Sequence, residues 1–463
     1  MFSQWQLRAA FARRLSGMYG REVPAYTTLV DVSREVNEEV LRERGADAER
    51  LGSIGRVTAE RHGAIRVGTP GELGQVARVF GALGMYPVGF YDLREAAGSA
   101  IPVVSTAFRP VDGEELARNP FRVFTSMLTP ADPRFFDPGL RARLENFLAG
   151  RELFPPELLA LADRAEAAGE LSDTDAERFL HLAVQVFELS PEPVDKAWYE
   201  TLEKVSAVAA DIGGVRSTHI NHLTPRVLDI DALYRRMTER GIEMIDAIQG
   251  PPRWPGPDVL LRQTSFRALA EPRAMRTPDG EVISGALRVR FGEVEARGIA
   301  LTRRGRARYD ALLARVDELA ARDPQAERAD VARAVWTAEL PATEHALAAE
   351  GLAHFTYHAV PGRPADGSRP PAALGALLDQ GWIRAVPIVY EDFLPRSAAG
   401  IFQSNLSDEG SRNNDRTGIA YDSAWLSGAI GREVLDPFDL YEDQQNRSLA
   451  QVARELALDG LPG

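Results

Sequence analysis

The first part of the chain combines a helical spacing of apolar positions with short runs typical of strands. Leu7, Phe11, Leu15 and Tyr19 are four residues apart, which predicts helix over about residues 3–50. The pattern after this helical region predicts one β-α-β-β-β module. The elements of this first module are a strand at 63–67, a turn at 68–71, a helix at 72–83, and strands at 101–108 and 121–128.

The middle of the chain follows a different pattern. Leu140, Leu144 and Leu148 keep helical spacing, and the same spacing continues through residues 131–210 with acidic residues between the apolar ones. This stretch therefore predicts a helical insertion between two modules.

A second module is predicted from about Thr218 onward. Its elements are a strand at 222–227, a turn at 228–231, a helix at 232–240, and strands at 260–269 and 286–297. The link between the last two strands contains Thr277-Pro-Asp-Gly280, a strong turn sequence. Further elements are helices at 307–321, 330–340 and 444–458, a strand at 382–390, and loops at 361–371 and 404–417.

Together these elements predict an α+β fold. We expect the two β-α-β-β-β modules to form a half-barrel around a metal site, with a helical insertion and helical termini. The predicted divisions are 1–130 for the N-terminal helices and first module, 131–210 for the insertion, 211–310 for the second module, and 311–463 for C-terminal helices and a strand that complete the core.

One short sequence occurs in both modules. His62-Gly-Ala-Ile-Arg66-Val recurs as His222-Leu-Thr-Pro-Arg226-Val, and each copy begins a predicted strand. Residues at even separations share a strand face, so each module would offer one imidazole and one guanidinium on one face. A duplicated strand with one histidine per copy can bring two imidazoles to a single metal ion, which predicts an enzyme with a metal centre.

A carboxylate for this centre is available in Phe291-Gly-Glu-Val-Glu-Ala-Arg297, where Glu293 and Glu295 share a strand face. A solvated strand face is the alternative interpretation of this pattern. Two histidines and one glutamate form the set that holds iron(II) in non-haem oxygenases and leaves positions open for substrate and oxygen. The same ligand types suit other divalent cations, so they do not select the metal.

Five other histidines are weaker candidates. His219 lies three residues before the second repeated histidine and faces the other side of a regular strand, which favours a position at the strand edge or behind a ligand. His354 and His358 share a face in either a helix or a strand, but they lack the glutamate of a zinc-protease motif. His181 and His345 fall in or near predicted helices and are interpreted as structural.

Arg66 is the candidate for substrate binding. It lies roughly 13 Å along the strand from His62, and its long side chain can reach back toward the metal. A guanidinium matches the geometry of a carboxylate. A linear acid bound to the metal at one end would therefore meet Arg66 at the other, whereas the alternative is a structural salt bridge.

Composition narrows the class of protein. The chain contains no cysteine, which excludes disulfides, thiolate metal sites and cysteine nucleophiles. Its net charge of −13, without a local basic patch, argues against a nucleic-acid partner. The N-terminus does not resemble a signal peptide and no apolar run reaches the length of a membrane span. We therefore expect a cytoplasmic protein without a membrane partner.

These motifs resemble known families. The histidine repeat resembles that of the vicinal oxygen chelate superfamily, and 291–297 resembles the last-strand motif Phe-Phe-Glu-Ile-Ile-Gln-Arg of its 4-hydroxyphenylpyruvate dioxygenase branch, which selects Glu293 rather than Glu295. Most of the chain is similar to the 2-oxoadipate dioxygenase/decarboxylase family. The segments that carry this similarity are Arg61-His-Gly-Ala-Ile-Arg, Ile220-Asn-His-Leu-Thr-Pro-Arg, 291–302, and Tyr390-Glu-Asp-Phe-Leu-Pro-Arg-Ser-Ala-Ala-Gly-Ile-Phe-Gln-Ser404.

The resemblance implies an iron(II) enzyme that converts a 2-oxo dicarboxylic acid, 2-oxoadipate, and O2 to (R)-2-hydroxyglutarate and CO2 in lysine catabolism. It also implies roles for particular residues. Arg66 would bind the distal carboxylate of the substrate, and a turn at Arg396-Ser397 would close the pocket. The metal ligands and catalytic residues would be His62, His222 and Glu293.

Two other functions remain open. A different enzyme of the vicinal oxygen chelate superfamily, such as a lyase, an isomerase or a dioxygenase for another 2-oxo acid, would use the same ligands. A non-catalytic binding protein would keep the fold without turnover.

Overall fold

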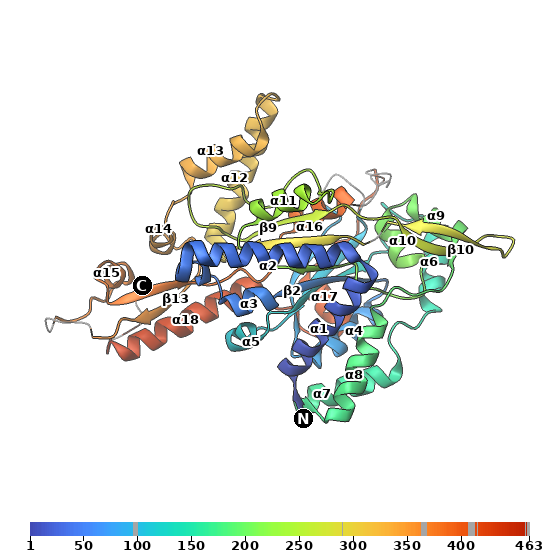
Figure 1. Cartoon of the computed structure of the whole chain (residues 1–463), viewed down its shortest axis with the longest axis horizontal. Coiled ribbons are helices and arrows are strands. Elements are labelled where there is room, and N and C mark those ends of the chain that lie inside the picture. Colours follow the sequence, from blue (N-terminus) through green and yellow to red (C-terminus); the bar gives the residue numbers. More distant parts are fainter. Residues whose placement is uncertain are drawn as a thin grey trace.

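The computed structural model describes residues 1–95, 101–288, 290–362, 368–405, 413, 415–458 and 460. The strands are β1 Phe2–Ser3, β2 Arg61–Val67, β3 Tyr86–Asp92, β4 Val103–Arg109, β5 Arg122–Leu128, β6 Glu170–Leu171, β7 Val194–Asp195, β8 His222–Pro225, β9 Leu261–Phe266, β10 Glu271–Arg276, β11 Val282–Leu287, β12 Gly292–Arg297, β13 Phe355–Ala359 and β14 Ile383–Pro387. The chain forms an α+β structure in which the five-stranded sheet and the β9–β12 pair lie at the centre with helices around them, whereas β10 and β13 lie toward opposite ends (Figure 1).

Helices account for most of the remaining described residues. They are α1 Gln4–Glu22, α2 Pro24–Arg44, α3 Ile54–Ala59, α4 Pro70–Gly81, α5 Gly113–Arg118, α6 Pro138–Ala149, α7 Pro156–Ala168, α8 Asp173–Val186, α9 Lys196–Glu203, α10 Ala207–Gly213, α11 Ile230–Glu239, α12 Arg303–Arg322, α13 Arg328–Glu339, α14 Glu344–Ala349, α15 Leu374–Asp379, α16 Pro395–Asn405, α17 Ser423–Ile430 and α18 Pro437–Glu455, with a 3-10 helix at Gly45–Glu49. None of the described helices is long and apolar enough to cross a bilayer.

The first predicted module is present, with one strand that the pattern did not predict. Strands β2, β3, β4 and β5 and helix α4 occur in the order β-α-β-β-β, interrupted only by the short α5. The additional strand is β3, whose apolar run is broken by Pro87 and Gly89. Gly89 has φ +76°, and the pairing with β4 shifts register between Val88 and Tyr91. A bulge of this kind hides a strand from a search for strict alternation.

The central sheet has five strands in the order β3-β4-β5-β2-β8. Strand β2 pairs in parallel with β5 and antiparallel with the edge strand β8, so both of its edges are hydrogen-bonded within the sheet. All residues of β2 after Arg61 are buried. Helix α4, which follows β2, begins with a capping box between Thr69 and Glu72 and with Pro70 in its first turn. Residues 68–71, which were predicted as a turn, therefore mostly form the beginning of α4.

The second module differs from its prediction. Its first strand, β8, joins the sheet of the first module, whereas β9 and β12 pair with each other in a separate two-stranded sheet. The run 286–297, expected as one strand, is divided between the end of β11 and β12. The turn at Thr277–Gly280 connects β10 to β11 in a hairpin, and β10 also pairs with β7. Strand β10 was not predicted, because its sequence lacks clear alternation.

The pairing of β9 with β12 depends on one glycine. A Cβ at Gly292 would lie 1.9 Å from the ring of Phe266, its partner in the ladder. Strand β12 also contacts β8 through a bridge between Arg226 and Glu295. Strands β2, β8 and β12 are consequently neighbours in space, although they are far apart in the sequence.

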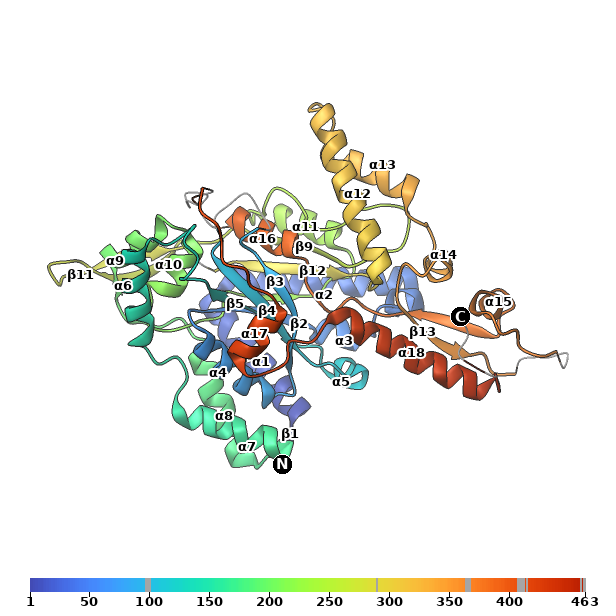
Figure 2. The ribbon, with the colours of Figure 1, turned by 180° about the vertical axis from the view of Figure 1, so that it is seen from behind.

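Helices α6 to α10 occupy the region predicted as a helical insertion. Helices α12 and α13 project from the body on one side, and β13, β14 and α18 form a lobe at one end (Figures 1 and 2). The predicted helices at 307–321, 330–340 and 444–458 correspond to α12, α13 and α18, and the predicted strand at 382–390 to β14. The loops predicted at 361–371 and 404–417 fall partly outside the described residues, and the four-part division of the chain stays a prediction.

Candidate metal centre

Two neighbouring strands bring the repeated histidines together. In the antiparallel pairing of β2 with β8, His222 lies opposite Ala64, two residues from His62 on the same face. The small side chain of Ala64 leaves room for both imidazoles, whose ring centroids are 5.4 Å apart. Both side chains are buried.

Strand β12 supplies a carboxylate between the two rings. Glu293 Oε1 lies 3.5 Å from His62 Nε2, and Glu293 Oε2 lies 3.2 Å from His222 Nε2. One donor atom from each of the three residues can be chosen so that all lie within 4.8 Å of one another. Glu293 also accepts a hydrogen bond from Gln263 Nε2 on the paired strand β9. The alternative of a solvated strand face is wrong, because Glu293 and Glu295 are both buried.

Glu295 contacts the opposite edge of the His62 ring. Its Oε2 lies 2.8 Å from His62 Nδ1, which leaves Nε2 directed toward Glu293. Arg297 donates to both Glu295 oxygens at 2.8 Å, and Arg122 donates to Oε1 at 3.2 Å. A carboxylate in this position fixes the tautomer and the orientation of a ligating imidazole.

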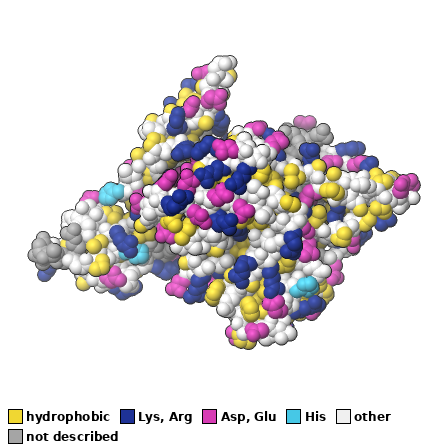
Figure 3. Space-filling view, viewed as in Figure 1, with side chains coloured by type: hydrophobic (Ala, Val, Ile, Leu, Met, Phe, Trp, Pro, Cys, Tyr) yellow, Lys and Arg dark blue, Asp and Glu magenta, His cyan; other side chains and the backbone are white. Residues whose placement is uncertain are grey.

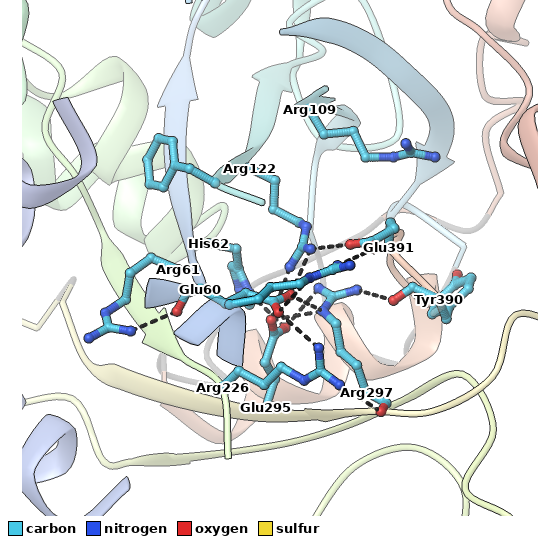
Figure 4. A network of polar contacts seen from close by, with 12 residues as sticks. Glu60, Arg61, His62, Arg109, Arg122, Arg226, Glu295, Arg297, Tyr390 and Glu391 are labelled. Atoms are coloured by element: carbon cyan, nitrogen blue, oxygen red, sulfur yellow. Dashed lines mark hydrogen bonds and ion pairs between the residues drawn. The ribbon is translucent and has the colours of Figure 1, made fainter. Parts of the chain in front are cut away.

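A larger ion-pair network lies behind Glu295 (Figure 4). Glu60 accepts from Arg122 at 2.8 Å and from Arg226 at 2.9 Å, and Arg122 also pairs with Glu391. These side chains are almost completely buried. Buried charges are tolerated only when they are paired and hydrogen-bonded, so the network holds β2, β5, β8 and β12 in one arrangement.

Burial lowers the pKa of both imidazoles. At His62 the nearby Glu295 carboxylate opposes this effect on the pKa, whereas at His222 the charges of His62 and Arg66 lower it further. Both rings are therefore neutral at ordinary pH, and the neutral imidazole is the form that binds metals.

The pKa values of the two glutamates are shifted in opposite directions. Burial, together with the charge of Glu295, raises the pKa of Glu293 well above its usual range. Burial would also raise the pKa of Glu295, but Arg297, His62 and Arg122 hold it well below the usual range. Glu293 thus lacks a permanent cationic partner, and a divalent cation bound with His62 and His222 would stabilise its carboxylate. Two neutral imidazoles and one carboxylate fit such an ion.

Arg66 lies farther along β2, the strand of His62, and only part of its guanidinium is hydrogen-bonded. Its Nη1 donates to Asp211 Oδ2 at 2.5 Å, and its guanidinium lies 5.1 Å from the centre of the Phe402 ring. Its Nε and Nη2 are buried and have no hydrogen-bond partner among the residues that the structure describes. An unsatisfied buried cation of this kind is costly unless an anionic ligand completes it.

Comparison with known proteins identifies the family. The family model described as 2-oxoadipate dioxygenase/decarboxylase matches residues 11–405. The chain belongs to the 2-oxoadipate dioxygenase/decarboxylase family. It is accordingly an enzyme of the oxygenase class.

Individual relatives match over nearly the whole chain. The 2-oxoadipate dioxygenase/decarboxylase of Mycobacterium tuberculosis is 58% identical over 449 residues, 97% of each protein. That of Escherichia coli K12 is 40% identical over 455 residues, 96% of this chain and 97% of the relative. The crystal structure of the hydroxyglutarate synthase from Pseudomonas putida in complex with 2-oxoadipate superposes with a TM-score of 0.83, at 38% identity and over 99% of both chains.

The dioxygenase/decarboxylase motif at 390–404 does not bring Arg396 to the centre. Arg396 and Ser397 lie in the first turn of α16, and their role in closing the pocket stays a prediction. The Arg396 side chain is 61% exposed and its Nη2 lies 3.2 Å from Asp317, whereas Ser397 is buried. Pro395 begins a helix here, which directs the arginine outward.

The other histidines lie outside the set of donors around Glu293. His219 is buried beside the substrate candidate Arg66, since its Nε2 lies 3.3 Å from Asp211 Oδ1. His354 is buried in the C-terminal lobe, and His358 is exposed. The remaining two, His181 and His345, are exposed and lie in α8 and α14, and their interpretation as structural residues stays a prediction.

Several residues of the site were not predicted. They are Glu60, Arg122, Asp211, Gln263 and Glu391. Arg122 stands as a charged residue inside the apolar run of β5, and this exception could have marked it. Gln263 has no such signal, because its neighbours in β9 are also polar. Asp211 and Glu60 have no comparable signal, because their partners are distant in the sequence.

Replacing Glu295 with Gln should weaken metal binding by roughly 10- to 100-fold, because His62 loses the carboxylate that orients its ring. The affinity for a divalent metal can be measured by competition with a chromogenic chelator. The matched control is Glu391→Gln, which removes a carboxylate from the same network without touching a ligand. Equal losses of metal affinity in both variants would show that Glu295 acts only through its charge in the ion-pair network and does not orient His62.

His354 should make the protein sensitive to acid. Burial lowers its pKa to about 4, against a hydrogen bond to Gln445 that raises it, whereas an unfolded histidine has a pKa of about 6.5. Its stabilising contribution is complete above pH 6.5 and is lost as the pH falls toward 4, since the unfolded chain takes the proton first. Native protein should lose up to about 3 kcal/mol of unfolding free energy relative to His354→Gln between pH 7 and 4.

Urea unfolding of both proteins across this pH range provides the measurement. His181→Gln, which changes an exposed histidine of α8, is the matched control for replacing a histidine that is not buried. A His354→Gln variant with the same pH dependence as the native chain would contradict the prediction.

Proposed function

We propose that this oxygenase is an iron(II)-dependent 2-oxoadipate dioxygenase/decarboxylase. It converts 2-oxoadipate and O2 to (R)-2-hydroxyglutarate and CO2, a step of lysine catabolism. The observation that carries the proposal is the buried set of His62, His222 and Glu293 on the same side of the sheet as an incompletely paired Arg66. The relatives' names and the bound 2-oxoadipate of the Pseudomonas putida structure support the choice of substrate.

The proposed half-barrel is formed by β2, β8 and β12, whose inward faces would line the reaction space. His62, His222 and Glu293 would hold iron(II) on one side and leave its other positions open. Bound iron(II) would supply the activation of O2 and of the 2-oxo acid.

Arg66 would bind the distal carboxylate of 2-oxoadipate through its unpartnered Nε and Nη2. Asp211 holds the remaining Nη1 and so directs the free edge of the guanidinium. Phe402, against the same guanidinium, helps to exclude water. The substrate would thereby be fixed at both ends, which keeps its reacting carbons next to the metal.

The reaction balances without a second substrate. The bond between the carboxylate carbon and the keto carbon breaks, and CO2 leaves. One oxygen atom of O2 enters the new carboxylate of the five-carbon acid. The other is inserted into a C–H bond at the adjacent carbon, C2 of the product, and the hydrogen of that bond becomes the hydroxyl hydrogen. No separate reductant is required, because the substrate itself supplies the electrons.

The decisive experiment uses the full chain, purified without metal and reconstituted with iron(II). With 2-oxoadipate under 18O2, consumption of O2 should match release of CO2, and the 2-hydroxyglutarate should contain two 18O atoms. A lyase or isomerase would convert a substrate without consuming O2. A non-catalytic protein would show no turnover, and ligand binding would survive in His62→Ala. Either result would overturn the proposal.

A further inference from the structure

A cavity whose lining includes none of the metal-centre residues lies where α6, α9, the end of α10 and β10 meet. These elements are grouped at one end of the molecule in both views of the ribbon (Figures 1 and 2). The cavity has a volume of about 600 Å3, within the range of small-molecule sites. The residues that define its chemistry are Arg143, Phe147, Trp198, Arg216, Arg273 and Arg276.

Arg273 is the unusual member of this group. It is 7% exposed, its Nε is buried without a hydrogen-bond partner, and it forms no ion pair with the described residues. The nearest acidic neighbour on its strand, Glu271, is already paired with Arg290. Burial, together with the charge of Arg290, lowers the pKa of Arg273, and the more distant carboxylates of Asp211, Glu192 and Glu271 offset this only in part. A buried guanidinium left in this state lacks an anionic partner.

The neighbouring arginines surround the same space. Arg143 stacks at 4.7 Å over the ring of Trp198, and Arg216 lies 5.5 Å from the centre of the Phe147 ring. Stacking restrains a guanidinium while leaving most of its N–H groups available. Arg276, two residues after Arg273 on β10, also forms no ion pair with the described residues.

The charges of the cavity do not cancel. Four arginines line it, against the two carboxylates of Glu192 and Asp195, which leaves a net charge of +2. Asp195 is further occupied as the N-cap of α9. On the face of the molecule shown in Figure 3, by contrast, basic and acidic side chains lie interspersed across the middle of the surface.

We propose that this cavity binds a small dianion, either a phosphate monoester or a dicarboxylate, with Arg273 as its principal partner. Arginine forks recognise both oxyanions through paired N–H groups. The site includes none of the proposed metal ligands, so the proposal is independent of the function assigned above.

Calorimetric titration of the full chain with inorganic phosphate, and separately with glutarate, tests the assignment. The affinity for at least one probe should fall at least about tenfold in Arg273→Gln, because charge-assisted hydrogen bonds are lost. An effect on phosphate alone identifies a phosphate monoester site, one on glutarate alone a dicarboxylate site, and one on both a general oxyanion site. The control is Arg333→Gln, an exposed arginine of α13, which should bind as the native chain does.

Two results would overturn the proposal. One is the absence of binding for both probes, and the other is the same affinity in Arg273→Gln as in the native chain. If Arg273→Gln fails to fold, Arg276→Gln takes its place, since Arg276 is exposed at the cavity rim. That variant should weaken binding at least about threefold, and unchanged binding would count against the site.

Discussion

Replacing Glu293 with Gln should remove bound iron and O2 consumption while the protein remains folded. Glu293 is the only anionic member of the proposed ligand set, and its carboxylate lies between the Nε2 atoms of His62 and His222. A neutral amide cannot replace this charge, so the loss of metal affinity should exceed the roughly 100-fold limit expected for partners behind the ligands. Gln263 can still hydrogen-bond to the amide, which favours retention of the fold.

Metal content by atomic emission and O2 uptake with 2-oxoadipate provide the two measurements. The matched control is Glu281→Gln, the same substitution at an exposed position before β11. It should retain both metal and activity. An active Glu293→Gln variant with full iron content would exclude Glu293 as a ligand.

Removing the charge of Arg66 should change the preference for the substrate's distal group. The double variant Arg66→Gln, Asp211→Asn removes both members of the buried pair, so that no isolated Asp211 charge destabilises the fold. Its kcat/KM for 2-oxoadipate should fall by roughly 30- to 1000-fold, corresponding to about 2–4 kcal/mol for a lost buried charge contact. Its kcat/KM for 2-oxohexanoate, which lacks the distal carboxylate, should change little.

Steady-state O2 uptake with the two acids gives this comparison directly. Asp211→Asn alone is the companion variant, because it keeps Arg66 and should retain the preference for the dicarboxylate. Equal losses for both acids in the double variant would assign Arg66 a structural role.

Local pattern predicted much of the first module and the two histidines of the centre. The repeat placed His62 and His222 on two strands of the same kind, and the structure pairs these strands with Ala64 opposite His222. The predicted strand at 63–67 and the helix after it are present because alternation and capping act over a few residues. Strand β3 escaped prediction because Pro87 and the bulge at Gly89 interrupt its alternation.

The choice between the two glutamates could not come from the pattern alone. Glu293 and Glu295 share a strand face, and only the resemblance to a known motif selected Glu293. In the structure Glu293 faces the Nε2 atoms of both imidazoles, whereas Glu295 holds Nδ1 of His62 from behind. Arg226, the counterpart of Arg66 in the repeat, pairs with Glu60 in the buried network and has no place at the substrate.

The sequence by itself determined that the chain has two copies of a histidine-bearing strand, a nearby acidic strand and no thiolate ligands. These are properties of residue type and short-range periodicity. Only the tertiary structure decided that β8 joins the first sheet, that Arg396 faces solvent, and that Arg66 is left with unpartnered N–H groups. His62 and Glu295 are 233 residues apart. Contacts over such distances depend on how strands pair and which charges are buried together, and neither is encoded in the spacing of neighbouring residues.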